Sequence, residues 1–230
     1  SNNNLIEEKT KIGLGRYRKN TFEYDFKGRI ISKVDGNGNN TKYYYDDLNK
    51  KYIKDPMEVV TASGYRYIYK YDNVGRNTAI QTDYGEIQFS YNRLNYVSEI
   101  RDANGNITRK VYDNMGNIIG FYPPNCKSQG YRYKYDHMDR LISIKDPLNT
   151  IKKSIRDSEG NIIKEVNPNY YDYTTEDGIG TEYVYDKDNR KIKTIYPDGG
   201  IERFFYDANG NVIRHISPEY YNEKTDDGLG

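Results

Sequence analysis

Tyr206-Asp207-Ala208-Asn209-Gly210-Asn211-Val212-Ile213 is the stretch that decides the fold of this chain. It predicts a strand end, a tight turn and a new strand, because Asp, Asn and Gly favour turns and two aliphatic residues follow them. The chain carries nine versions of it, which open at Tyr24-Asp25, Tyr45-Asp46, Tyr71-Asp72, Tyr91-Asn92, Tyr112-Asp113, Tyr135-Asp136, Arg156-Asp157, Tyr185-Asp186 and Tyr206-Asp207. Successive copies lie 20 to 29 residues apart, and a period of this size indicates a repeat architecture.

The position four residues after the start of each copy always holds Gly, Asn or Asp. These residues are Gly28, Asn49, Gly75, Asn95, Gly116, Asp139, Gly160, Asn189 and Gly210. All three residue types tolerate positive φ. The pattern predicts a type I turn closed by a G1 bulge, in which the first Asp accepts hydrogen bonds from the N–H groups of its own turn.

A second set of turns alternates with the first and completes each unit of two short strands. Its members include 35–38, 102–105, 146–149 and 197–200, which are rich in Asp, Asn, Pro and Gly. Apolar residues do not recur at helical spacing, whereas 131–135 alternates Tyr with Arg and Lys. The sequence therefore predicts an all-β fold of tandem antiparallel β-hairpins, in a curved or spiralling single-layer sheet with Tyr packed across strands.

The chain divides into three parts on this pattern. Residues 1–20 form a lead-in with strands of a degenerate repeat, and 21–217 hold nine repeats. Residues 218–230 repeat the pattern of 168–180 and are expected to start a further, truncated repeat. Three longer units carry inserts at 56–64, 123–130 and 168–180. We interpret these inserts as loops that either make specific contacts or only lengthen a turn at a bend of the sheet.

The composition narrows the functional class. With 35 basic and 34 acidic residues the net charge is +1, which argues against a nucleic-acid partner or binding to an anionic membrane. No apolar run reaches the length of a membrane span. The chain has 27 Tyr and no Trp; it is too polar for a large dry core and too regular for a disordered segment. Cys126 is the single cysteine, so no internal disulfide is possible.

Two stretches carry a resemblance to a known family. Tyr71-Asp72-Asn73-Val74-Gly75-Arg76 and Tyr112-Asp113-Asn114-Met115-Gly116-Asn117-Ile118 resemble the hallmark of the Rhs or YD-repeat family, and the resemblance spans 21–217. The departures are Tyr91-Asn92, Arg156-Asp157 and the Asn or Asp residues that replace Gly. The predicted turn tolerates all of them.

The resemblance implies a role in building a wall. YD repeats occur in bacterial Rhs proteins, wall-associated proteins, the C components of insecticidal toxin complexes and animal teneurins, where they wind into a hollow β-sheet shell. In the bacterial toxins the shell encloses a C-terminal toxic domain. The implied partners are therefore adjacent repeats and a C-terminal cargo domain of the same parent protein, and the implied location is secreted or at a bacterial cell surface. The core region that carries self-cleaving aspartates in some members has no counterpart here, so no catalytic residue is carried over.

Other chemistry receives little support from the residues. A Cys126 nucleophile with His137 or His215 as base lacks a supporting motif. The oxygen-rich turns at 35–39 and 186–189 could hold calcium, but they lack the Glu that ends an EF-hand loop. Acidic pairs arise by repetition alone and do not indicate a glycosidase. We predict no catalytic residue, no cofactor and no metal.

Two alternatives to a purely structural role remain open. Tyr170, Tyr171, Tyr220 and Tyr221 in the repeated insert could stack against sugar rings, which favours a carbohydrate-binding module. A sheet of this kind also has strand edges through which chains can self-associate. The leading prediction is a non-catalytic structural segment.

Overall fold

The computed structural model describes residues 4–46, 54–124, 126 and 129–228. The chain splits into two compact units, 1–109 and 110–230. Within the described residues there is no α-helix, and the one helical element is the 3-10 turn η2 (Pro218–Tyr220). The prediction of an all-β fold built from antiparallel hairpins is confirmed.

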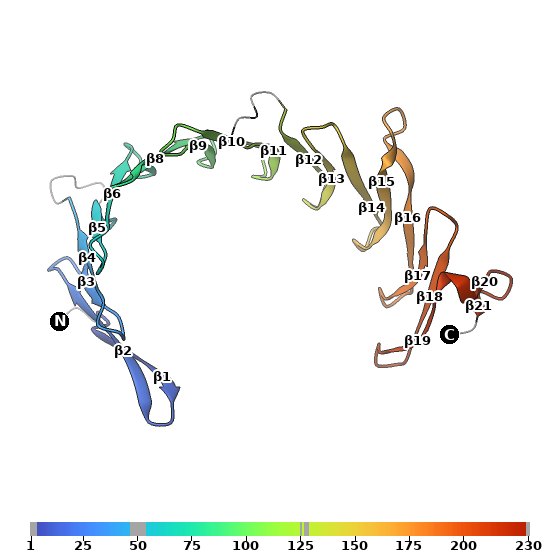
Figure 1. The fold of residues 1–230 in the computed structure, drawn as a ribbon, viewed down its shortest axis with the longest axis horizontal. Helices are drawn as coiled ribbons and strands as arrows, with labels where there is room; N and C mark the ends of the chain where they lie inside the picture. Colours follow the sequence, from blue (N-terminus) through green and yellow to red (C-terminus); the bar gives the residue numbers. More distant parts are fainter. Residues whose placement is uncertain (1–3, 47–53, 125, 127–128, 229–230) are drawn as a thin grey trace. The chain divides into compact units, whose positions relative to one another are not determined.

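The first unit is a run of nine strands and the start of a tenth (Figure 1). Each strand pairs antiparallel with the next one along the chain, so the unit is a succession of hairpins. The strands are β1 (Glu7–Gly13), β2 (Arg16–Tyr24), β3 (Ile30–Val34), β4 (Asn40–Tyr44), β5 (Glu58–Val60), β6 (Arg66–Tyr71), β7 (Asn77–Thr82), β8 (Gly85–Tyr91), β9 (Val97–Arg101) and β10 (Ile107–Tyr112).

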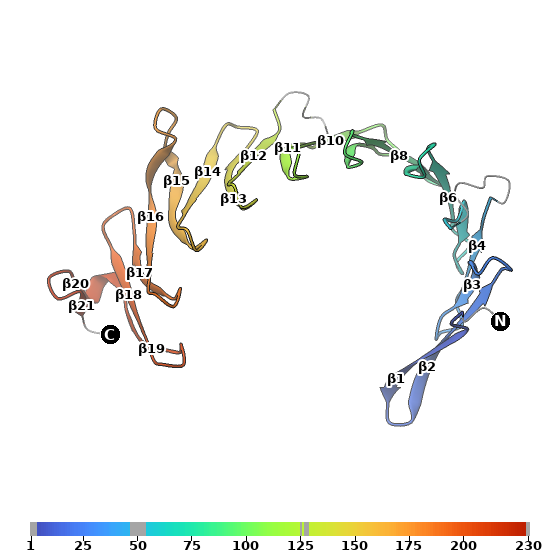
Figure 2. The ribbon, with the colours of Figure 1, turned by 180° about the vertical axis from the view of Figure 1, so that it is seen from behind.

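The second unit repeats this arrangement, and Figure 2 shows from behind that its strands follow one another in chain order. Antiparallel pairing joins each strand from β11 to β19 with the next. The strands are β11 (Ile118–Tyr122), β12 (Tyr131–Tyr135), β13 (Leu141–Lys145), β14 (Ile151–Arg156), β15 (Ile162–Asp172), β16 (Asp177–Tyr185), β17 (Lys191–Ile195), β18 (Ile201–Tyr206) and β19 (Val212–Ile216). The short strands β20 (Tyr221–Asn222) and β21 (Asp227–Gly228) pair with each other.

The strands that lead into a Tyr-Asp turn share a register shift just before their last residue. It falls between Lys70 and Tyr71 in β6 and between Phe205 and Tyr206 in β18. The same shift occurs in β2, β8, β12, β14 and β16. One extra residue beside the turn is the signature of a G1 bulge.

The hydrophobic core is thin because each unit is a single layer of strands. Among the described residues only four apolar side chains are buried, and these are Ala79, Ile151, Val166 and Ile216. Many Tyr, Ile and Val side chains remain partly exposed. Stability therefore depends heavily on hydrogen bonds and on contacts between neighbouring strands.

The lead-in and the inserts hold more regular structure than the sequence suggests. Residues 7–20 form the β1–β2 hairpin, with Leu14 and Gly15 in its turn rather than in a strand. The strand β5 occupies the middle of the 56–64 insert. The interpretation of 168–180 as a loop is wrong, because β15 and β16 continue through it and pair again at Tyr171 with Gly178 and at Asp172 with Asp177.

The 168–180 hairpin is repeated at 218–228. There Tyr221 pairs with Gly228 and Asn222 with Asp227, the same register 50 residues later. Glu176 and Asp226 both have positive φ, at 52° and 50°. The repetition extends beyond the hairpin, since residues 131–180 align without a gap on 181–230. The second unit therefore contains two copies of one 50-residue block.

Candidate functional site

The turns that open with a Tyr-Asp pair or its variant, which we call the YD turns, are closed by the side chain of their Asp, or of Asn in the variant at Asn92. In the turn at 72–76 the Oδ1 atom of Asp72 accepts hydrogen bonds from the N–H groups of Val74 and Arg76 at 2.9 and 3.0 Å. The Oδ2 atom accepts from the Arg76 Nε at 2.7 Å. Asp25, Asp136 and Asp186 accept the same three hydrogen bonds, and Asp113 and Asp207 accept an equivalent set in which an Asn Nδ2 replaces the Arg Nε.

The fourth residue after each Tyr adopts the left-handed conformation wherever the structure describes it. The φ angles are 80° at Gly28, 92° at Gly75, 94° at Gly116, 97° at Gly160 and 84° at Gly210, and 66° at Asn95, 58° at Asp139 and 60° at Asn189. Asn49 lies outside the described residues. Asn and Asp here accept a backbone conformation that costs them more than it costs Gly.

The tyrosine that opens a YD turn makes a hydrogen bond that the sequence analysis did not anticipate. Its hydroxyl donates to a backbone carbonyl at or just before the start of an earlier strand, which for every tyrosine but Tyr24 is the strand that follows the previous YD turn. The bonds join Tyr24 to Leu5 (2.6 Å), Tyr45 to Ile30 (2.8 Å), Tyr71 to Pro56 (2.9 Å), Tyr91 to Asn77 (2.6 Å), Tyr135 to Ile118 (3.0 Å), Tyr185 to Ile162 (3.0 Å) and Tyr206 to Lys191 (2.7 Å). Tyr112 ends β10. Each bond ties one hairpin to the one before it.

The fifth residue after the Tyr links one YD turn to the next. The Arg76 Nη1 donates to the Asn95 Oδ1 at 2.8 Å, and the Asn117 Nδ2 donates to the Asp139 Oδ1 at 2.7 Å. The Asn161 Nδ2 donates to the Asn189 Oδ1 at 2.8 Å. Among the described YD turns, Asn95, Asp139 and Asn189 are the residues that replace Gly at the left-handed position, and they are the three acceptors of these bonds. Their side chains supply a contact that glycine cannot make.

Arginine at the same position also stacks on the next tyrosine. The guanidinium carbon lies 4.3 Å from the ring centre for Arg29 over Tyr45, 4.6 Å for Arg76 over Tyr91 and 5.2 Å for Arg190 over Tyr206. These are cation–π distances. The recurring Arg or Asn at this position was visible in the sequence, but only the structure gives its role between turns.

The electrostatics of the YD turns follow from these bonds. Burial of the Asp136 carboxylate opposes ionisation, but the Arg140 and Met138 N–H groups and the Arg140 guanidinium outweigh it and lower the pKa of Asp136 to about 2. The pKa of Asp25, Asp72, Asp113, Asp157, Asp186 and Asp207 is lowered by turn hydrogen bonds in the same way. Burial raises the pKa of the Tyr71 hydroxyl to about 12. The turns thus favour ionised Asp and neutral Tyr.

The four tyrosines of the repeated hairpin differ in exposure. Tyr170 and Tyr220 are each 57% exposed, whereas Tyr171 and Tyr221 are half-buried. The Tyr171 ring meets Tyr173 edge to face, with ring centres 5.1 Å apart. The Tyr221 hydroxyl donates to Asp226 and accepts from Lys193. Only the first tyrosine of each pair is therefore available as a stacking platform.

The residues considered for catalysis or metal binding lie in separate elements. His137 is in the YD turn after β12 and His215 is in β19, where its ring stacks on Phe204 at 4.7 Å. Cys126 lies between β11 and β12. Within the described part of the chain, no group of three or more His, Cys, Asp or Glu side chains could hold a metal ion. No helix among the described residues is long and apolar enough to cross a membrane.

A family model describes this arrangement. The model of the teneurin YD-shell matches residues 6–152. The chain belongs to the teneurin YD-shell family. The predicted resemblance to YD-repeat proteins is confirmed. A comparison with curated proteins finds no match.

Solved structures show a similar fold in toxin complexes. The Photorhabdus luminescens Tc holotoxin pore, with a TccC3-D651A mutation, matches with a TM-score of 0.52 at 13% identity over 87% of this YD-shell chain. The TcdB2-TccC3 crystal structure matches with a TM-score of 0.46 at 14% identity over 90% of it. The chain spans only 13% and 16% of those chains. At such low identity the likeness concerns the fold alone.

Proposed function

We propose that this chain is a non-catalytic wall segment of a large bacterial protein, secreted or at the cell surface, whose YD shell encloses or displays another domain. The observation that carries the proposal is the coupling of each hairpin to its neighbour. In both units a tyrosine hydroxyl bonds the preceding hairpin, and a side chain five residues after the tyrosine bonds the next YD turn.

This coupling suits a wall better than a catalytic site. A single hairpin is marginally stable in water, and the thin core of each unit adds little burial. Bonds that repeat from hairpin to hairpin distribute stability along the array, as in other repeat proteins. The turn carboxylates are saturated by N–H donors, so they serve geometry and leave no activated acid or base.

Limited proteolysis of the full-length protein that contains this chain tests the proposal. If the repeats form a container, the region that follows them stays intact until the repeats unfold, as mass spectrometry of the digest would show. The variant Tyr71→Ala should let protease reach that region at a lower urea concentration, while Tyr84→Ala, whose ring is 77% exposed, should not. Immediate cleavage of the region in the folded wild type contradicts the enclosing role.

Carbohydrate binding is the second candidate, and the exposure of Tyr170 and Tyr220 favours it. Exposed aromatic rings stack on the apolar faces of sugars. A panel of cell-wall and host glycans at millimolar concentration should then show binding that is lost in a Tyr170→Ala, Tyr220→Ala double variant and kept in Tyr84→Ala. Absence of binding by the wild-type chain across the panel removes this candidate and leaves the structural role intact.

A further inference from the structure

Two cations stand directly opposite each other on paired strands in three places within the described residues. These pairs are Lys9 with Lys19, Lys193 with Arg203, and Arg132 with Lys145. Like charges at directly opposite positions repel each other and destabilise a sheet. Each pair is therefore expected to have an acid close by that offsets the repulsion.

A carboxylate bridges two of the three pairs. The Glu7 carboxylate lies 3.0 Å from the Lys9 Nζ and 2.8 Å from the Lys19 Nζ. In the second unit Asp226, in the turn of the β20–β21 hairpin, forms salt bridges with both members of the Lys193–Arg203 pair. In both cases the acid belongs to a protein segment that lies against the two cations.

The third pair has no such acid. Neither Arg132 nor Lys145 forms a salt bridge within the described residues. The Glu176 carboxylate reaches the same face of the sheet, but both of its oxygens accept from the Lys134 Nζ, at 3.0 and 3.1 Å. The insert at 123–130, which leads into β12, contains no Asp or Glu. The Arg132–Lys145 pair thus keeps a positive charge that the two other pairs lose.

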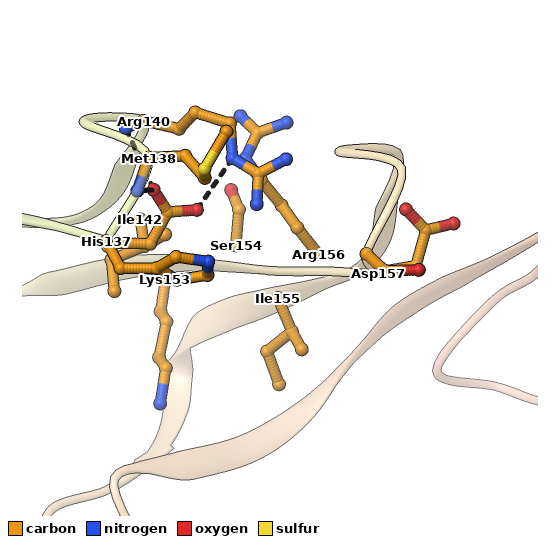
Figure 3. Close-up of a pocket in the computed structure, with 11 residues that line it drawn as sticks. His137, Met138, Arg140, Ile142, Lys153, Ser154, Ile155, Arg156 and Asp157 are labelled. Atoms are coloured by element: carbon orange, nitrogen blue, oxygen red, sulfur yellow. Dashed lines mark hydrogen bonds and ion pairs between the residues drawn. The ribbon is translucent and has the colours of Figure 1, made fainter.

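The pair lies on a defined face of the sheet. Lys145 is paired with Arg132 on one side and with Ile151 on the other, so the three side chains share one face. Lys153 follows two residues after Ile151 and lies on that face as well. Figure 3 shows Lys153 on one side of β14 and Ser154 on the other. The cationic pair therefore faces away from the side on which Ser154 lies.

The two cations border a hollow of about 170 Å³, which is also lined by Gln129, Gly130 and the turn that begins at Asp146. The Asp146 Oδ1 atom accepts from the N–H groups of Leu148 and Thr150 at 2.9 and 2.8 Å, so this carboxylate closes its own turn. The hollow is smaller than the sites that hold drug-sized ligands. It has room for a single acidic side chain.

Arg132 is held in a position to bind. Its guanidinium carbon lies 4.8 Å from the centre of the Tyr122 ring. Gly120 leaves room beneath it, because a Cβ at that position would lie 3.1 Å from the Arg132 Nη1. Arg132 donates no hydrogen bond to another described residue. A guanidinium over an aromatic ring keeps the N–H groups at its edge available to a carboxylate.

We propose that Arg132 and Lys145 form a docking site for an acidic turn of a partner protein, whose Asp or Glu carboxylate enters the hollow between them. The carboxylate would take the place that Glu7 and Asp226 have at the two other pairs. The guanidinium and the carboxylate match in shape and charge. This interaction surface goes beyond the shell function and does not need it to be correct.

Titration of the 230-residue chain with a capped acidic peptide, followed by two-dimensional amide NMR, tests the site. The peptide is acetyl-Asp-Tyr-Thr-Thr-Glu-Asp-Gly-amide, the sequence of residues 172–178. In low-salt buffer we expect saturable shifts at Gly130, Arg132 and Lys145, with a Kd of about 1–10 mM. The same peptide with Asn, Gln and Asn in place of its three acids should show no saturable binding, because the site recognises charge.

The second copy of the block supplies the variants. Arg132→Glu and Lys145→Ile introduce the residues that stand 50 positions later, at 182 and 195, so both suit the fold. Each should weaken peptide binding about tenfold or more. Lys145→Ile also removes the repulsion between the two cations, so its urea midpoint should not fall. Lys152→Ile, which removes an exposed cation from the other face of β14, should leave the Kd unchanged.

The proposal makes the pair, its charge and its face all necessary for binding. It is overturned if no saturable shift appears by about 20 mM peptide, or if the amide peptide binds as well as the acidic one. It is also overturned if Arg132→Glu or Lys145→Ile binds as the wild type does, or if Lys152→Ile weakens binding as much as they do.

Discussion

The two ends of the strands use one turn geometry for different purposes. We call the turns at 35–39, 61–65, 102–106, 146–150 and 196–200 the opposite turns. At Asp102, for example, the carboxylate accepts from the N–H groups of Asn104 and Asn106 at 2.9 and 2.8 Å, just as in a YD turn. The left-handed residue is also present, with φ of 82° at Gly105.

The difference lies between turns rather than within them. Among the described residues, the carboxylate of each opposite turn that has one accepts only within its own turn. The hydrogen bonds that leave these turns follow no repeated pattern: Tyr173 donates to the Asn149 carbonyl at 2.6 Å, Tyr65 bonds Tyr84, and Tyr196 bonds Glu202. The YD turns add a tyrosine hydroxyl and an Arg or Asn side chain that reach the neighbouring hairpin. Local turn chemistry therefore makes a hairpin, and the YD residues make an array.

The largest effect should come from removing a YD tyrosine. Tyr71→Ala deletes a half-buried ring and the hydrogen bond to Pro56. It should lower the free energy of unfolding by about 2–4 kcal/mol. Tyr84→Ala, at the other end of the strands in the 82–85 turn, should cost less than about 1 kcal/mol. Urea unfolding followed by circular dichroism gives both values, and equal losses would show that the two ends contribute alike.

The second-largest effect should come from acid, which protonates the carboxylates of the YD turns. The folded-state pKa of Asp136 is about 2, below the unfolded value of about 3.9. Its contribution to stability is therefore present above pH 3.9 and is lost as the pH falls through about 2. The other YD carboxylates shift in the same direction, so the urea midpoint should fall steeply across this window.

The variant Asp136→Asn isolates one carboxylate from the rest. Asn92 shows that Asn closes a YD turn, because its Oδ1 accepts from the N–H groups of Leu94 and Tyr96. The wild type should be the more stable protein at pH 6, and its advantage over Asp136→Asn should shrink toward zero at pH 2. A constant difference across the pH range would mean that the carboxylate charge does not contribute.

The hydroxyl of Tyr71 can be tested apart from its ring. Tyr71→Phe leaves the Pro56 carbonyl without its donor and should cost about 1 kcal/mol. Because burial raises the pKa of Tyr71 to about 12, the hydroxyl contributes below the unfolded value of about 10 and its contribution is lost as the pH rises through 12. Urea midpoints at pH 8 and pH 11.5 should therefore converge for the two proteins at the higher pH. Parallel midpoints would contradict a role for the hydroxyl proton.

The sequence was informative where structure is set by neighbouring residues. The left-handed residue four after Tyr71 and the carboxylate of Asp72 act within five residues, so the repeated pattern predicted a bulged hairpin turn. The all-β fold followed from that turn. The acceptor of the Tyr71 hydroxyl lies 15 residues earlier, and no local rule assigns such a contact because it depends on strand register.

The 168–180 hairpin escaped prediction for a related reason. Its turn has Glu176 at positive φ, without the Gly or Asn-Gly pair that marks hairpins in a sequence. Its strands are held by close backbone approach: a Cβ added to Gly178 would lie 2.2 Å from the Tyr170 carbonyl oxygen. Salt bridges to residues outside the insert also hold the hairpin, such as the one between Lys164 and Asp177 at 3.2 Å. The difference in exposure between Tyr170 and Tyr171 follows from this strand pairing and could not be read from the Tyr-Tyr motif itself.

The smallest predicted effect is also the most specific test of the comparison between the YD turns and the opposite turns. Asn95 in a YD turn and Asn149 in an opposite turn both have positive φ, at 66° and 69°. Replacing either with Gly relieves a similar backbone strain. Only Asn95 accepts a hydrogen bond from the preceding turn, through Arg76 at 2.8 Å.

Asn95→Gly should therefore lower the free energy of unfolding by about 0.5–1 kcal/mol, the lost bond being partly offset by the relieved strain. Asn149→Gly should be neutral or stabilise the chain by a few tenths of a kcal/mol, because its backbone carbonyl still accepts from Tyr173. Both values come from urea titrations of single variants. If Asn149→Gly destabilises as much as Asn95→Gly, side chains at left-handed positions act only within their own turns, and the coupling between YD turns rests on tyrosine alone.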